Sequence, residues 1–195
     1  MPGQQPGPAV QKRLTAPENL MRTFPQTTLI TQDEFKQGMQ QLAACVNVIT
    51  SGFEGSRRGM TATAVCSLTS DPPSLIVSVN RSARTFDNIA NSRKLCVNLL
   101  AEDQQSISNV FASSKGDSEE KFNSAGIWTS SASGQPMLED CVANFVCAVD
   151  RWLVTKTHYV VVANICEIRL RDDLKPVLYH GRGYSTMASE PAEMV

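Results

Sequence analysis

Residues Arg57 to Thr85 read RRGMTATAVCSLTSDPPSLIVSVNRSART, and the expected fold rests on this stretch. Small side chains dominate the run from Thr61 to Ser67, which indicates a strand without bulk. The two prolines at 72 and 73 predict a corner, because each proline locks its own φ and restricts the residue before it. The β-branched run from Leu75 to Val79 then predicts a second strand, which is buried.

The first of these strands suits a flat ligand. A planar ring can lie against small side chains without meeting bulk, and the backbone N–H and C=O groups then become available to the ring edge. The second strand leads into small polar and basic residues, namely Asn80, Arg81, Ser82, Arg84 and Thr85, just before a short predicted helix at 86–90.

This polar cluster suits a phosphate. The amides of a helix N-terminus, hydroxyl groups and guanidinium groups all bind phosphate oxygens. In the alternative interpretation, Ser82 is only an N-cap and the arginines are solvated surface charges.

The run from Gly59 to Thr85, followed by KLCVNLL at residues 94–100, resembles the small flavin reductases of two-component flavin monooxygenases. The resemblance is closest to the reductase component of hydroxyphenylacetate hydroxylases and extends from about Phe35 to Tyr184. It implies a mainly β protein, an antiparallel six-stranded FMN-binding split barrel with a few flanking helices. It also implies a homodimer with the flavin near the subunit interface.

The resemblance assigns a flavin site. The ring is expected along the strand of small residues, with its edge bonded by strand amides and by Ser67 or Ser78, and the phosphate is expected in the polar cluster. A G-D-x-x-x-K-F pattern beside the flavin is met by Gly116, Asp117, Lys121 and Phe122. The expected flavin-binding residues are Thr61, Ala62, Thr63, Ala64, Ser67, Ser78, Asn80, Ser82, Arg84, Thr85, Lys121 and Phe122.

The resemblance also assigns a nicotinamide site at His158, with Arg182 and Tyr184 near it in the glycine-rich C-terminal segment. The family has a glycine two residues before this histidine, whereas this chain has Lys156. The alternative role of His158 is to satisfy a backbone group at a strand end. Arg57 and Arg58 either face the phosphates of the nicotinamide cofactor or, as we favour, carry solvated loop charge.

The implied function is hydride transfer from NADH or NADPH to FMN or FAD, after which free reduced flavin leaves for a separate flavin-dependent monooxygenase. No catalytic side chain is expected, because the protein's share is to stack two rings at reacting distance. The alternatives are a non-catalytic flavin- or haem-binding split barrel and a pyridoxamine-phosphate oxidase-like enzyme. The choice between the two flavins, the choice between the two nucleotides and the identity of the oxygenase stay open.

Length and composition limit the kinds of partner and the cellular location that we expect for this protein. The 195 residues carry a net charge of −1, which argues against a general nucleic-acid or anionic-membrane surface. Residues 1–28 are rich in proline, glycine and glutamine and predict a flexible arm, residues 29–187 predict one domain, and residues 188–195 a tail. With no apolar stretch long enough for a signal peptide or membrane span, we expect a cytoplasmic protein.

The six cysteines lie in apolar runs without C-x-x-C spacing, so we expect reduced core residues and no metal site. Thr31 and Glu34 match a capping box, which predicts a helix packed on the sheet through Phe35, Met39 and Leu42. The other expected strands are 45–51, 94–100, 137–153, 158–170 and 177–180. The other expected helices are 103–112 and the end of 113–122, with a connector at 127–136.

Overall fold

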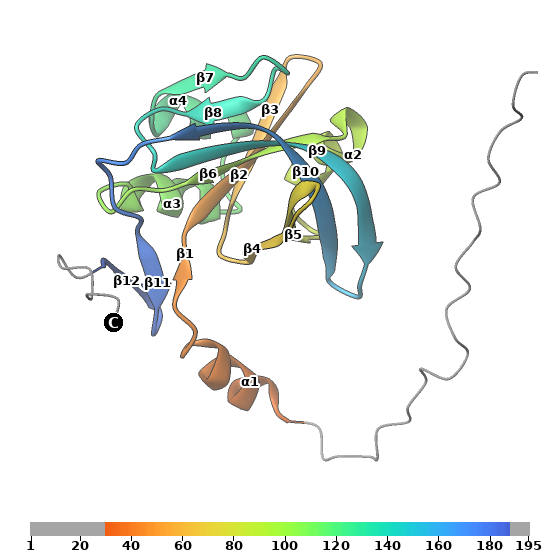
Figure 1. Cartoon of the computed structure of the whole chain (residues 1–195). Helices are drawn as coiled ribbons and strands as arrows, with labels where there is room; N and C mark the ends of the chain where they lie inside the picture. The colour runs from red at the N-terminus through yellow and green to blue at the C-terminus, as the bar shows by residue number, and fades with distance from the viewer. Residues whose placement is uncertain (1–29, 188–195) are drawn as a thin grey trace, which may run out of the picture.

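The computed structural model describes residues 30–187. The predicted arm at 1–28 and the predicted tail at 188–195 lie outside the described residues. The centre of the described part is a seven-stranded sheet in the order β3-β2-β6-β9-β10-β5-β4, in which every neighbouring pair is antiparallel (Figure 1). Its strands are β2 (Asn47–Phe53), β3 (Ser56–Ala62), β4 (Val65–Ser70), β5 (Pro73–Asn80), β6 (Lys94–Leu99), β9 (Ala143–Val154) and β10 (His158–Leu170).

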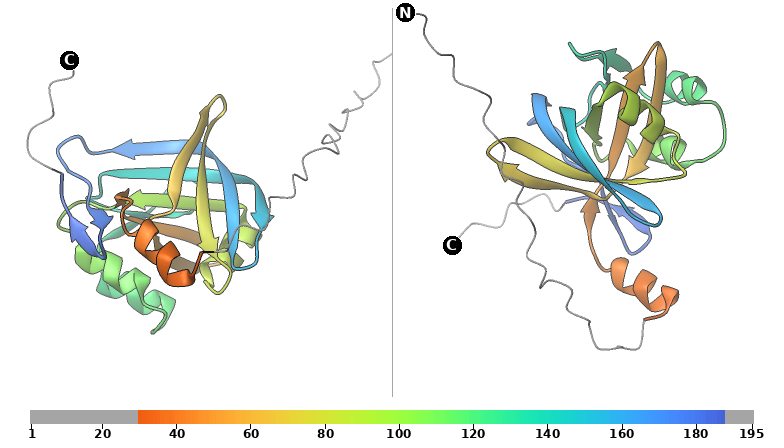
Figure 2. Two further views of the ribbon diagram at one scale, coloured as in Figure 1. Left: turned by 90° about the horizontal axis from the view of Figure 1, so that it is seen from below. Right: turned by 90° about the vertical axis from the view of Figure 1, so that its right-hand side faces the viewer.

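The sheet closes into a split barrel because of one short connection. β3 and β4 stand at opposite ends of the strand order, yet only Thr63 and Ala64 separate them in the chain. Such a link holds two strand ends close together, so the sheet has to curl round on itself. Figure 2 shows the curled sheet from two further directions. The mainly β split-barrel class expected from the sequence is therefore confirmed. The sheet has seven strands instead of the expected six, and the expected continuous strand from Thr61 to Ser67 is broken at this link.

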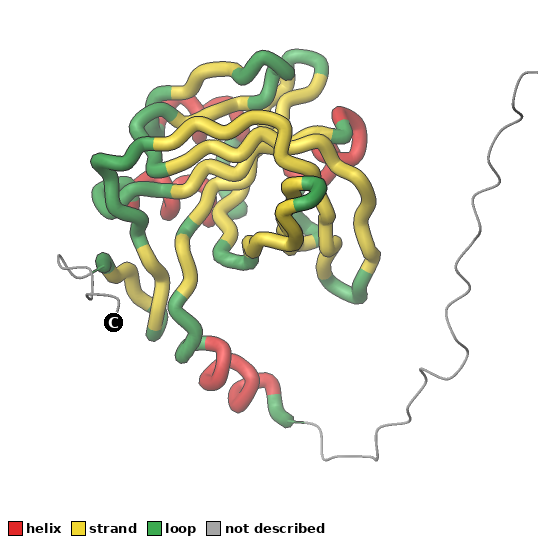
Figure 3. The backbone as a smooth tube through the Cα atoms, in the orientation of Figure 1, coloured by secondary structure: helices red, strands yellow, loops and turns green. Residues whose placement is uncertain are grey.

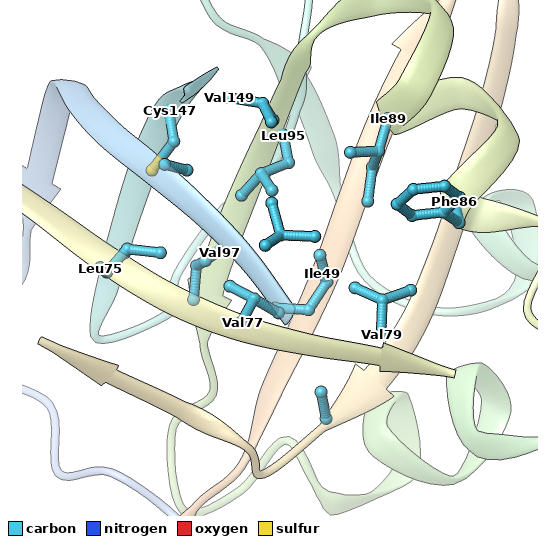
Figure 4. Packing of buried hydrophobic residues seen from close by; sticks show 13 residues of the cluster. Ile49, Leu75, Val77, Val79, Phe86, Ile89, Leu95, Val97, Cys147 and Val149 are labelled. Atoms are coloured by element: carbon cyan, nitrogen blue, oxygen red, sulfur yellow. The ribbon is translucent and has the colours of Figure 1, made fainter. Parts of the chain in front are cut away.

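The barrel is filled by aliphatic side chains from all the long strands (Figure 4). Ile49, Val77, Val97 and Val161 are completely buried, and each such side chain contributes about 1.5–3 kcal/mol when it leaves water. The middle four residues of β6 are all buried, as expected for a strand covered on both faces. Strand ends and hairpin tips carry the exposed polar residues, so the barrel rim is where ligands can reach the protein.

Three helices lie beside the barrel (Figure 3): α2 (Thr85–Ser92), α3 (Gln105–Ala112) and α4 (Ser118–Ser124). α2 inserts Phe86 and Ile89 into the barrel core. α3 and α4 instead contribute Phe111 and Phe122 to a second apolar cluster. Residues at the start of α2 and Ser118 and Lys121 of α4 line a common pocket with β3.

The predicted connector and the long strand after it are wrong in detail. The connector contains β7 (Trp128–Ser130), and the expected strand 137–153 is divided into β8 (Pro136–Leu138) and β9. Asp140, at a left-handed φ of 55°, lies in the turn between them. Buried amides hold β8 in place, since Asn98 Oδ1 accepts from the Leu138 amide at 2.9 Å and from Asn144 Nδ2 at 2.8 Å. Long-range bonds of this kind leave no local signal in the sequence.

The chain ends in a small separate sheet that the sequence predicted only in part. β1 (Ala44–Cys45), β11 (Leu178–His180) and β12 (Gly183–Ser185) form three antiparallel strands in the order β1-β11-β12. The strand expected at 177–180 is confirmed as β11. β12 was not expected, because its glycine-rich sequence lacks the β-branched run on which strand prediction depends.

α1 (Gln32–Met39) forms as predicted, but it does not pack on the sheet. Its capping box is present, with Thr31 Oγ1 accepting from the Glu34 amide at 3.2 Å. None of its residues is buried, and Phe35 is 55% exposed and Met39 48% exposed. Figure 1 shows the helix standing away from the barrel. The apolar face that the sequence predicted is therefore real, and its expected contact is wrong.

The cysteines are all free, and only some lie in the core. Cys96, Cys141 and Cys147 are buried, and burial raises the pKa of Cys141 to about 11 and that of Cys147 to about 12. Cys66 and Cys166 are exposed, contrary to the expectation of a core position. Within residues 30–187 the structure contains no helix long and apolar enough to cross a membrane.

Candidate functional site

A pocket of about 260 Å³ opens between β3, the start of α2 and the region from the end of α3 to α4. Three of its side chains are cationic, namely Arg58, Arg84 and Lys121. The full lining is Arg58, Gly59, Met60, Thr61, Asn80, Ser82, Ala83, Arg84, Thr85, Phe111, Ala112, Ser113, Ser114, Gly116, Ser118 and Lys121. Of the expected flavin-binding residues, the structure thus brings together Thr61, the polar cluster at 80–85 and Lys121.

The turn between β5 and α2 is built by Asn80. Its Oδ1 accepts from the Ser82 amide at 2.9 Å and from the Ser82 hydroxyl at 2.8 Å, and its carbonyl accepts from the Ala83 amide at 3.0 Å. The N-cap position of α2 is Arg84, so the interpretation of Ser82 as the N-cap is wrong. No side chain within residues 30–187 caps this helix, and the amides of Phe86 and Asp87 donate instead to the carbonyls of Ala83 and Arg84 at 3.1 and 3.2 Å.

The β3 wall of the pocket is tied to α3. Thr61 Oγ1 donates to the Ser108 carbonyl at 2.6 Å, and Phe111 of α3 lies against the backbone of Gly59. A Cβ at Gly59 would come within 2.7 Å of Phe111 Cε1, so this close approach requires glycine. Sequence reasoning missed Gly59, although a glycine inside a strand is a signal of close backbone approach.

The α4 side of the pocket matches the G-D-x-x-x-K-F pattern residue by residue. Gly116 adopts a left-handed φ of 83° and lines the pocket, and Asp117 caps α4 in a capping box with Glu120. Lys121 projects into the pocket lining, where its Nζ donates to the Ser113 carbonyl. Phe122 is 2% exposed and packs against Phe111, so it belongs to the second apolar cluster and not to the pocket lining.

The electrostatics of the pocket favour an anion. Burial, and after it the charge of Arg84, lower the pKa of Lys121. The two cations therefore repel one another, and a bound anion would relieve that repulsion. Several hydroxyls surround the cations, among them Ser82, Thr85 and Ser114. Guanidinium, ammonium and hydroxyl donors together form the donor set that phosphate prefers, so these residues fit the phosphate of a flavin.

The other expected flavin-binding residues lie outside this pocket lining. Ala62, the last residue of β3, is buried, while Thr63 and Ala64 form the exposed link to β4. Ser67 is exposed on β4, and Ser78 is half-buried in β5, where its amide donates to the Ala64 carbonyl at 3.0 Å. Of the residues assigned to the ring, the pocket lining therefore contains Thr61 and none of the others.

His158 lies beside the pocket, because it pairs with Asn80 across β10 and β5. Its Nδ1 lies 2.9 Å from Thr157 Oγ1, and its backbone amide donates to Thr155 Oγ1 at 3.0 Å. Thr155 thus closes the turn where the family has a glycine. The main-chain N–H and C=O of His158 make the hydrogen bonds at this strand end, so the imidazole is not needed to satisfy a backbone group there. His158 is half-buried at the barrel rim.

Arg182 and Tyr184 belong to the small sheet and not to the barrel rim. Arg182 is exposed in the β11–β12 turn at a left-handed φ of 68°. The Tyr184 hydroxyl donates to Asn109 Oδ1 at 2.8 Å and accepts from the Ser108 hydroxyl at 2.9 Å, so its ring docks on α3. The structure therefore does not bring these two side chains into contact with His158 within the described residues.

The two arginines weighed as loop charges have different positions. Arg58 lines the pocket, and Arg57 forms an ion pair with Glu119 of α4. The interpretation as solvated loop charge is therefore wrong for both, because β3 extends further toward its hairpin turn than expected. Within residues 30–187 no cluster of three or more histidine, cysteine or acidic side chains is arranged to hold a metal ion.

Known proteins are similar to this chain in sequence and in fold. Residues 39–188 match the family model described as flavin reductase like domain. The chain is 37% identical over 161 residues to FMN reductase (NADH) RutF of Pseudomonas syringae pv. syringae, covering 83% of this chain and 89% of that protein.

Two solved structures extend the comparison. A candidate flavin reductase from Haemophilus somnus has a TM-score of 0.78 and 35% identity, covering 81% of this chain and 100% of that one. A homolog of nitrilotriacetate monooxygenase component B from Mycobacterium thermoresistibile has a TM-score of 0.76 and 26% identity, covering 84% of this chain and 92% of that one. Since the family match spans more than half of the chain, the protein belongs to the flavin reductase family, which confirms the enzyme class expected from the sequence.

Proposed function

We propose that this protein uses NADH to reduce free FMN and that the reduced flavin leaves for a separate flavin-dependent monooxygenase. The observation that carries the proposal is the convergence of Arg58, Arg84 and Lys121 in one hydroxyl-lined pocket on a flavin reductase fold. The name of the Pseudomonas syringae relative supports FMN and NADH, and the name of the Mycobacterium thermoresistibile structure supports an oxygenase partner. FAD and NADPH are the competing choices.

In the proposed site the flavin phosphate lies among the residues at the start of α2 and on α4. Arg84 and Lys121 neutralise its charge, and the hydroxyls of Ser82 and Thr85 donate to its oxygens. Bound flavin supplies the acceptor to which NADH transfers a hydride. The task of the protein is to hold the two rings at reacting distance and to exclude other orientations.

The ring is proposed to lie along the link from Thr61 to Ala64. The carbonyls of Thr63 and Ala64 accept from the amides of Val65 and Ser78, whereas their own amides have no partner within residues 30–187. Two exposed amides next to small side chains suit the acceptor edge of a flavin ring. His158 is proposed to contact the nicotinamide, since its pairing with Asn80 places it at the same rim.

We also propose that the chain works as a homodimer in the cytoplasm. β4 is an edge strand whose residues from Cys66 to Ser70 are all exposed, and α1 and the turn that follows it present Phe35 and Leu42 to solvent. Open edges and apolar helix faces of this kind are normally covered. The six free thiols agree with a reducing compartment.

Steady-state NADH and NADPH oxidation, with FMN or FAD added in turn, tests the proposed activity. We expect turnover that depends on added free flavin, with FMN and NADH as the preferred pair. Stoichiometric flavin binding without nucleotide oxidation would instead support a non-catalytic flavin-binding module.

The nicotinamide site is tested with His158→Ala in the same assay. We expect the KM for NADH to rise while the Kd for FMN, measured by quenching of flavin fluorescence, stays at the wild-type value. Equal effects on both constants would mean that His158 does not contact the nicotinamide selectively.

A further inference from the structure

Arg57 lies outside the pocket but makes the contacts that hold one of its walls. Its Nε and Nη2 donate to Glu119 Oε2 of α4 at 3.0 and 2.6 Å, and its backbone amide donates to Glu119 Oε1 at 3.2 Å. The two side chains are 34% and 45% exposed, so the pair is only partly screened by water. A forked pair of this kind has a defined geometry as well as charge.

Three further residues of α4 meet the same arginine. Ser118 Oγ donates to the Arg57 carbonyl at 2.7 Å, and Arg57 Nη2 donates to Asn123 Oδ1 at 3.5 Å. The guanidinium carbon lies 4.7 Å from the centre of the Phe122 ring, which packs edge-on against Phe111 and Trp128 with ring centres 5.1 and 4.8 Å apart. One residue of β3 therefore contacts four residues of α4 along its length.

On α4, Ser118 both donates to Arg57 and lines the pocket, whereas Glu119 binds Arg57 and Lys121 reaches the pocket from opposite sides of the helix. Glu119 and Lys121 are two positions apart, so their side chains leave the helix about 200° from one another. One side is thereby bound to Arg57 while the opposite side extends Lys121 into the pocket. On β3, the residues directly after Arg57, from Arg58 to Thr61, line the same pocket.

We propose that Arg57 is a positioning residue that, through Glu119 and α4, sets the position of Lys121 over the flavin phosphate. The inference rests on the proposed placement of that phosphate. Arg57 itself does not touch the flavin, and its effect passes through the orientation of a short helix. Loss of Arg57 therefore weakens binding of phosphorylated flavins and leaves the ring site intact.

The test compares FMN with riboflavin, which has the same ring and no phosphate. Arg57→Met, Glu119→Gln and Lys121→Met are each assayed with NADH, and flavin affinity is measured separately by fluorescence quenching. We expect each variant to raise the KM and Kd for FMN about tenfold, the size of one charge-assisted hydrogen bond, while the riboflavin constants and kcat stay within twofold. Arg57→Lys should fall between wild type and Arg57→Met, since lysine keeps the charge but loses the fork.

A double variant separates positioning from general structural support. If Arg57 acts through Lys121, Arg57→Met adds nothing to the FMN defect when Lys121→Met is already present. Additive effects, or equal losses for FMN and riboflavin, would overturn the inference. Arg151→Met serves as a matched control, because Arg151 is an exposed β9 arginine paired with the adjacent Asp150, and it should behave as wild type.

The outcomes distinguish this inference from the function on which it rests. Wild-type protein that oxidises no NADH with any flavin refutes the proposed activity. Active protein in which Lys121→Met affects both flavins equally refutes the placement of the phosphate and, with it, the inference. A selective Lys121→Met defect with no such defect in Arg57→Met or Glu119→Gln refutes the role of Arg57 alone. Glu119→Gln is close to isosteric, so it covers the case in which Arg57→Met does not fold.

Discussion

At the scale of single residues, the site depends on positions whose roles the sequence only partly reveals. Asn80 was expected to hold the phosphate, and in the structure its side chain shapes the turn that presents Ser82 and Arg84. Gly59 carries no functional group, yet it allows α3 to approach β3. The site therefore needs residues that build the backbone as much as residues that bind.

Gly59→Ala is expected to destabilise the protein by about 1–3 kcal/mol, because the new methyl group overlaps the ring of Phe111. It should also raise the KM for FMN, since both residues line the pocket. Urea unfolding and steady-state kinetics measure the two effects. Gly38→Ala is the matched control, because nothing lies within 4 Å of its added Cβ, and an equal loss of stability there would contradict the steric account.

The ion pair of Arg57 and Glu119 predicts a defined pH dependence. The Arg57 hydrogen bond lowers the pKa of Glu119 below its ordinary value of 4.5. A lowered pKa in the folded state means that the stabilisation is complete above that ordinary value and is lost as the pH falls through the folded value. The Tm difference between wild type and Glu119→Gln should therefore be constant near neutral pH and shrink on acidification. A difference that does not shrink would show that the charge of Glu119 is not its source.

At the scale of elements, the local sequence pattern predicts where strands form, while hydrogen bonds from polar side chains far away in the chain determine which strands lie side by side. β8 is held against β6 and β9 by Asn98, which is completely buried and also donates to the Val48 carbonyl at 2.8 Å. A sequence reading of Met137 and Leu138 as the start of a longer strand misses this, because the deciding bonds come from a residue about forty positions earlier.

Asn98→Ala is expected to cost about 1–3 kcal/mol for each buried group that it leaves unpaired, and to loosen the β7–β8 hairpin. Urea denaturation gives the loss of stability, and hydrogen exchange at the Leu138 amide reports the hairpin directly, since that amide donates to Asn98 Oδ1. Asn91→Ala, at an exposed position on α2, is the control. Retained protection at Leu138 in the Asn98 variant would contradict the proposed anchoring.

At the scale of the whole molecule, the exposed apolar surfaces point to a second copy of the chain. An eight-residue helix such as α1 is only marginally stable in water without tertiary contacts, yet none of its residues is buried in the described part of the chain. β4 is likewise open at the barrel edge, with Leu68 46% exposed. Both features are explained if a partner subunit covers them, as we propose.

The combined change Phe35→Asp and Leu42→Asp is expected to convert a dimer into a monomer, because it places two charges in a face that the partner would have to desolvate. Size-exclusion chromatography with light scattering measures the mass. Gln37→Asp, on the same helix, adds a charge without removing apolar surface and should leave the dimer intact. A wild-type protein with the mass of one chain would refute the dimer.

The sequence by itself determined the fold class and the polar cluster in which we propose that the phosphate lies. Strand and helix periodicity, the double-proline corner and the polar cluster at 80–85 are local patterns, and local patterns are what a single sequence displays. The run from Arg57 to Thr85 also carried the family resemblance that the comparisons confirm.

Only the tertiary structure decided which residues meet. In the structure, Arg58, Gly59 and Ser114 line the pocket. Phe122 is buried in an apolar cluster, and Tyr184 contacts α3. The tertiary structure also left the face of α1 uncovered and gave Arg57 its contacts with α4. The physical reason is that each of these outcomes depends on hydrogen bonds, ring contacts or closures between residues far apart in the chain. Their energies depend on three-dimensional distance, which residue order alone does not specify.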